Sequence, residues 1–212
     1  MNKRRFTSLW TRCQAGKGTG VRAEDVFNEV HDGYSAPGRF YHTPRHIEHC
    51  LIQFDFVAGE MENPDAVEMA IWFHDLIFDV DVDDNELQSA RRFGELANDS
   101  MDAEFKTRVY DLIMATAPPR LPKTGDQKFM LDIDLSSFGL PWDDFVRDSV
   151  AVRQESPKLS DADFFPGQRA FLESLVSREH FYFTDFFRSR IEETARSNIN
   201  RHLENLRSQG VT

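Results

Sequence analysis

The sequence is poor in cysteine and has no long apolar run. Cys13 and Cys50 are its two cysteines among 212 residues, which is too few for a disulfide framework and lacks the CxxC spacing of many zinc sites. We therefore expect a reducing, cytoplasmic setting. No stretch approaches the roughly 20 apolar residues that cross a bilayer. The basic residues 1–5 precede no apolar run, so we expect neither a membrane span nor a signal peptide.

Positive charge is also scarce. The chain has 36 acidic residues against 25 lysines and arginines, a formal net charge of −11. A protein of that charge repels the phosphates of nucleic acids and of anionic lipid headgroups. We therefore expect no nucleic-acid partner and no membrane partner.

A phosphate-binding glycine loop is missing as well. Residues 14–20 hold three glycines, but their spacing is not that of a P-loop and no strand pattern precedes them. We interpret this stretch as a flexible connection. Accordingly, we expect an N-terminal segment over residues 1–20, with a short apolar patch at 6–10, and one domain over residues 21–208.

Strand signals are absent from the sequence, which has no hairpin pattern and no strictly alternating run. Helical spacing recurs instead. Thr43 and Pro44 predict the start of a helix that runs to about Val57, with apolar residues at i, i+3, i+4 and i+7. We expect an all-α fold, with a loop over 156–168 and further helices near residues 22–33, 64–79, 85–97, 101–117, 142–155, 171–175 and 191–206.

The central feature is the apolar run 71–79, which contains His74 and Asp75. A helix that is apolar on all sides lies in a core, and a buried carboxylate is costly unless it is paired or binds a metal. A structural His-Asp hydrogen bond and a metal site both satisfy this requirement, and the pair alone does not decide between them.

Other candidate ligands lie elsewhere in the chain. His46 falls in the first turn of the helix that begins at Pro44, where the imidazole is favoured in the neutral form that binds metals. Asp132 and Asp134 lie in the apolar run 128–135, and their spacing lets at most one of them face a given small site.

The acidic stretch that begins at residue 79 does not fit a calcium loop, because it lacks the required Gly and Glu.

This order of residues, H…HD…D, resembles the HD superfamily of metal-dependent phosphohydrolases. Within it, the chain is similar to a bacterial family described as predicted metal-dependent HD phosphohydrolases, from about residue 34 to 206. The matching blocks are YHTPRHI (41–47), FHDLIFD (73–79), NELQSA (85–90), LDIDLS (131–136), RQE (153–155) and ARSNI (195–199).

The resemblance implies a single-domain HD-type helical bundle with one buried metal site between helices. The implied ligands are His46, His74, Asp75 and Asp132, with Asp132 preferred to Asp134 because the family uses the first acid of its DxD-like block. A set of imidazoles and carboxylates suits Mn, Fe, Co, Ni, Zn or Mg.

The implied activity is hydrolysis of a phosphate ester or anhydride of a small molecule, such as a nucleotide, by a metal-activated water. Asp79, one turn after Asp75 on the expected helix, is the preferred group to take the proton of that water, and Glu86 is the second choice. The candidate phosphate-binding residues are Arg39, Arg45 and Arg153.

Two alternatives stay open. One is a non-catalytic sensor that binds a nucleotide at the metal site. The other is a di-iron HD-type oxygenase, which needs additional ligands such as His42 and His49. The stretch 115–120 has no His where related sequences carry one, which favours a single metal ion. Substrate identity, native metal and oligomeric state are left open by the sequence.

Overall fold

The computed structural model describes residues 1–15 and 21–208, and these residues form helices and turns with no strand among them. The predicted all-α class is therefore confirmed for the described ranges. Within them, every helix is too short or too polar to cross a membrane. Most of the flexible connection expected at 14–20 lies outside the described residues.

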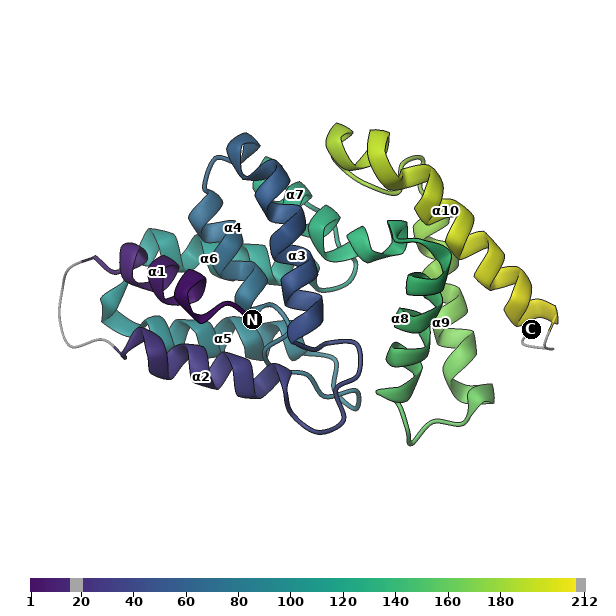
Figure 1. The fold of residues 1–212 in the computed structure, drawn as a ribbon, viewed down its shortest axis with the longest axis horizontal. Coiled ribbons are helices and arrows are strands. Elements are labelled where there is room, and N and C mark those ends of the chain that lie inside the picture. The colour runs from purple at the N-terminus through teal and green to yellow at the C-terminus, as the bar shows by residue number, and fades with distance from the viewer. Residues whose placement is uncertain (16–20, 209–212) are drawn as a thin grey trace. The chain divides into compact units, whose positions relative to one another are not determined.

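The chain divides into two compact units, residues 1–134 and 135–212, where the sequence predicts a segment over 1–20 and one domain over 21–208. In the first unit, α4 (Pro64–Phe73) is the central element and is buried from Ala66 to Phe73 (Figure 1). Its neighbours in contact are α1 (Lys3–Cys13), α3 (Pro44–Val57), α5 (Asn85–Ala97), α6 (Ala103–Thr116) and α7 (Gly125–Asp134). The unit also contains α2 (Ala23–Tyr34), which packs on α1, and the 3-10 turns η1 (Ala58–Glu60) and η2 (Asn98–Ser100).

Aromatic side chains hold α1 against α4. Phe6 and Trp10 are fully buried, and the Phe6 ring lies 5.2 Å from that of Trp72 in an edge-to-face arrangement. Phe73 makes a similar contact with Phe93 of α5, also at 5.2 Å. The apolar patch expected at residues 6–10 is thus one face of a helix in the core.

The central helix is shorter than expected. It ends at Phe73, and His74 is its C-cap residue. The chain then turns, and residues 74–84 are not helical. Asp75 and Asp79 therefore do not lie on one helical face, which removes the geometric reason for preferring Asp79.

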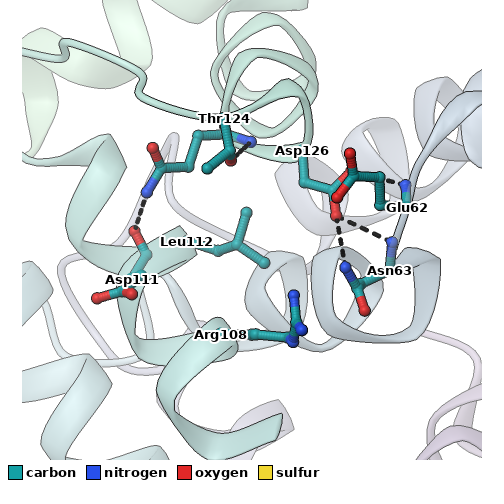
Figure 2. A pocket seen from close by; sticks show the side chains of 8 residues that line it. Glu62, Asn63, Arg108, Asp111, Leu112, Thr124 and Asp126 are labelled. Carbon is teal, nitrogen blue, oxygen red and sulfur yellow. Dashed lines mark hydrogen bonds between the residues drawn. The ribbon is translucent and has the colours of Figure 1, made fainter. Parts of the chain in front are cut away.

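The start of α4 is fixed by a carboxylate from α7. Figure 2 shows Asp126 facing the main-chain N–H groups of Glu62 and Asn63, which donate to its two oxygens at 2.9 Å each. The N-cap residue Asn63 makes no side-chain cap of its own, so Asp126 satisfies donors at the positive end of the helix. This contact holds the first turns of α4 and α7 together.

The second unit consists of η3 (Leu135–Gly139), α8 (Trp142–Gln154), α9 (Asp161–Val176) and α10 (Asp185–Ser208). Helix α10 contacts both η3 and α9. The Asn198 side chain joins α10 to the turn after η3, because its amide donates to the carbonyls of Phe138 at 2.9 Å and Leu140 at 2.8 Å. Asn198 thus has a packing role within this unit.

Helix α9 corrects the loop expected over residues 156–168. It begins at Asp161, and the Ser160 hydroxyl accepts the N–H of Asp163 as an N-cap. Pro166 lies inside this helix. Proline usually ends or kinks a helix, which explains why the sequence pattern misplaced its start.

Candidate metal centre

Four potential ligands gather in the first unit. They are His46 from α3, His74 at the end of α4, Asp75 just after it, and Asp134 at the end of α7, and one ligand atom from each lies within 4.8 Å of the others. The group could hold a metal ion. Three of the four ligands expected from the sequence are brought together here.

The distances fit a single ion. Two donors about 2.1 Å from one ion lie about 3.0 Å apart at adjacent octahedral positions, about 3.4 Å apart in a tetrahedron and about 4.2 Å apart at opposite octahedral positions. The Nε2 atoms of His46 and His74 are 3.3 Å apart, and each lies 3.4 Å from Oδ1 of Asp134. Oδ2 of Asp75 lies 3.0 Å from Nε2 of His74 and 3.8 Å from that of His46.

The His74 ring is oriented by the helix that it terminates. Its Nδ1 lies 3.0 Å from the carbonyl oxygen of Ile71, a distance at which Nδ1–H donates to that carbonyl. In the neutral form of His74, this hydrogen bond keeps the proton on Nδ1, so that the Nε2 lone pair faces the other three ligands once its proton is displaced. Metal-binding histidines usually donate their second ring nitrogen in this way.

The four side chains also control one another's charge. Burial on its own raises the pKa of Asp75, but His74 and His42 outweigh it and lower that pKa below its ordinary value. The pKa of Asp134 is likewise lowered, because hydrogen bonds from His46 and His74 outweigh its burial. Both acids are therefore ionised at neutral pH, as metal ligands must be.

Residues beyond the ligands hold the Asp75 segment in place. The Asp75 N–H donates to the hydroxyl of buried Tyr34 at 3.2 Å. Arg39 donates to the carbonyls of Asp75 at 2.7 Å and of Leu76 at 2.6 Å. The guanidinium thereby satisfies main-chain acceptors in the turn that follows α4. The structure thus gives Arg39 a positioning role, whereas the sequence suggested substrate binding.

The fourth member of the cluster corrects the preference for Asp132. Both acids lie in the last turn of α7, where residues two apart point about 200° away from each other. Asp134 faces His46 and His74, whereas Asp132 is fully buried and is not a member of the cluster. Apolar residues flank both acids, so the pattern carried no signal about which one faces α3.

The expected proton acceptors lie outside the cluster. Asp79 is exposed, and its carboxylate accepts the N–H of Asp81 at 2.9 Å within the loop after α4. Glu86 is half-buried in the first turn of α5. By contrast, Nε2 of His42 lies 3.8 Å from Oδ2 of Asp75. From the sequence, His42 is expected only as an additional ligand of the alternative di-iron site.

The remaining candidate arginines differ in their surroundings. Arg45 is exposed beside His46 in the first turn of α3. Arg153 belongs to the second unit, where it donates to the Asp161 carboxylate at 2.9 Å and to the carbonyls of Ser156 and Leu159 at 2.7 Å. These contacts fix the turn between α8 and α9, and substrate binding by either arginine stays a prediction.

The choice between the two acids of α7 can be tested directly. We expect Asp134→Asn to weaken binding of Mn²⁺ at least about tenfold, because it removes an anionic ligand. Asp132→Asn, two residues away, should leave the affinity within about threefold of the wild type. Calorimetric titration with Mn²⁺ measures both values. The opposite ranking would restore Asp132 as the ligand.

Metal affinity should also depend on pH in a definite direction. Burial lowers the pKa of His74, but Asp75 and Asp134 outweigh it and raise that pKa well above the ordinary value of 6.5. The ion must therefore displace a proton at neutral pH. We expect affinity to increase with pH up to the raised pKa, by up to about tenfold per unit. Titration in buffers of different ionisation enthalpy measures the released proton, and pH-independent binding would contradict this account.

Comparison of the chain with protein-family models, with curated proteins and with solved structures finds no match.

Proposed function

We propose that this chain is a metal-dependent phosphohydrolase of the HD type, which cleaves a phosphate ester or anhydride of a small molecule, with nucleotides as the first candidates. The observation that carries the proposal is the buried set of two imidazoles and two carboxylates. The order H…HD…D in the sequence supports it, with Asp134 now taken as the last member. The HD-type fold is part of the same proposal.

Bound in this set, a divalent ion such as Mn²⁺, Fe²⁺, Co²⁺, Ni²⁺, Zn²⁺ or Mg²⁺ would polarise a phosphoryl oxygen and lower the pKa of a bound water. The two imidazoles are almost fully buried, whereas the side chains of Asp75 and Asp134 are 15% and 11% exposed. The carboxylates therefore mark the side of the cluster that solvent reaches. A small phosphorylated molecule could approach from that side.

His42 is the group that we assign to the proton of the attacking water. Its Nε2 lies 3.8 Å from Oδ2 of Asp75, and its side chain is 20% exposed. Its ring packs on that of Phe78, with centroids 4.2 Å apart, which restricts its orientation. An imidazole at this position can pass a proton between the water and solvent. His42 therefore replaces Asp79 and Glu86 as the first candidate.

The experiment is a screen for release of inorganic phosphate. Nucleotides and sugar phosphates would be incubated with Mn²⁺, Co²⁺, Ni²⁺, Zn²⁺ or Mg²⁺ in turn. We expect at least one combination to release phosphate, and Asp75→Ala to lower that rate at least about a hundredfold, because it removes a ligand of the cluster. The exposed acid Asp99 provides the matched control, and Asp99→Ala should keep the wild-type rate.

Other outcomes identify the alternatives. Tight nucleotide binding without phosphate release would favour a sensor. Two irons per chain, together with a charge-transfer band in the near ultraviolet, would favour an oxygenase. Phosphate release that persists in Asp75→Ala would separate the activity from this cluster and contradict the proposal.

A further inference from the structure

We propose that the second unit holds a binding site for an uncharged, largely apolar small molecule, in a cavity between α8 and the pair α9 and α10. The inference goes beyond the proposed phosphohydrolase activity and is independent of it, because this site needs no metal ion. It follows from the size and apolar walls of the cavity, from the contacts that hold its aromatic wall, from two polar side chains that line it and from the charge of its lining.

The cavity is of a size that suits a small ligand. Its volume is about 280 Å³, close to the lower end of the range of about 300–1,000 Å³ that is usual for small-molecule sites. Val150 is 51% exposed and Val146 is half-buried, so a ligand here would remove apolar surface from water. The apolar side chains that line the cavity are those of Trp142, Val146, Val150, Phe165 and Leu206.

The indole of Trp142 forms a wall that its neighbours hold in place. The Phe145 ring stacks on it with centroids 5.6 Å apart, and the guanidinium carbon of Arg201 lies 4.0 Å from the indole centroid. Phe145 also meets the imidazole of His202 edge to face, at 5.6 Å. These contacts connect α8 with α10 beside the cavity. The site is therefore largely formed before a ligand binds, which lowers the cost of binding.

Two polar side chains of the lining can bind a polar group of the ligand. Nε2 of His202 lies 3.5 Å from Oε1 of Gln168, which is long for a hydrogen bond. Burial lowers the pKa of His202 below its ordinary value of 6.5, so that the imidazole is neutral at pH 7 and offers one donor and one acceptor. A hydroxyl, an amide or a ring nitrogen of a ligand could therefore hydrogen-bond to either side chain.

The charge of the lining favours an uncharged ligand. Among the described residues that line the cavity, Arg153 is the only one that is charged at neutral pH. Its guanidinium donates to the Asp161 carboxylate at 2.9 Å and to the carbonyls of Ser156 and Leu159 at 2.7 Å, so its charge is already balanced. A charged ligand would lose hydration here without gaining an unpaired counter-charge. The net charge of −11 disfavours an anion further.

A matched pair of fluorescent probes tests the site. Phenylnaphthylamine is uncharged, and its sulfonated derivative anilinonaphthalenesulfonate has the same ring systems with one negative charge. Each probe would be titrated with the full chain, and the increase of its fluorescence on binding gives the Kd and the stoichiometry. The pair thereby measures how the site discriminates by charge alone.

Cavity-filling variants locate the bound probe. Val150→Trp fills the cavity from α8, and Ser149→Trp does so from the adjacent lining position. The matched control is Ile52→Trp, because Ile52 on α3 is 55% exposed and lies outside the cavity. Far-ultraviolet circular dichroism establishes that each variant keeps its helical fold.

We expect the wild type to bind one phenylnaphthylamine per chain, and to bind the sulfonated probe at least about fivefold more weakly. Each folded filling variant should bind phenylnaphthylamine at least about tenfold more weakly, because the added indole occupies the apolar volume. Ile52→Trp should match the wild type.

Four results would overturn the proposal: no saturable binding by the wild type, tighter binding of the sulfonated probe, wild-type affinity in a folded filling variant, or an equal loss of binding in Ile52→Trp. The titration requires neither metal nor turnover. Its outcome is therefore separate from that of the phosphate-release screen, and the two proposals can fail independently.

Discussion

Two carboxylates and two imidazoles face one another where α3, α4 and α7 meet, and neither carboxylate could stay ionised there without positive partners. The imidazole of His74 lies within 3.4 Å of both acids, and Arg120 contacts the second one. Protons or a divalent ion can supply the missing charge, and they compete for the same lone pairs. The need to neutralise Asp75 and Asp134 therefore links the fold of the first unit to its chemistry.

Two short helices, α4 and α7, maintain this arrangement, because they contact each other near their starts and again near their ends. Helices α4 and α7 each have ten residues, about 15 Å of helix. At their starts, Asp126 accepts N–H groups of Glu62 and Asn63. At their ends, His74 meets Asp134. The aromatic contacts of α1 and α5 with α4 complete the packing, so that the ligands project from a rigid core.

Much of this could be predicted from local sequence signals. Thr43 and Pro44 gave the start of α3 and hence the place of His46, and the buried character of α4 followed from its apolar run. The end of α4 could not be predicted, because Tyr34 and Arg39 hold the turn at Asp75 from other parts of the chain. The choice of Asp134 over Asp132 and the approach of Arg120 likewise depend on packing between helices, which periodicity does not encode.

The most direct test of the account is a crystal structure of the protein soaked with Mn²⁺, with diffraction data collected for anomalous scattering from manganese. The account predicts one strong anomalous peak in the first unit, bounded by Nε2 of His46, Nε2 of His74 and oxygens of Asp75 and Asp134. A saturated crystal with no peak among these atoms, and with the imidazoles hydrogen-bonded to the carboxylates instead, would show that the cluster is a structural ion-pair network and would contradict the account.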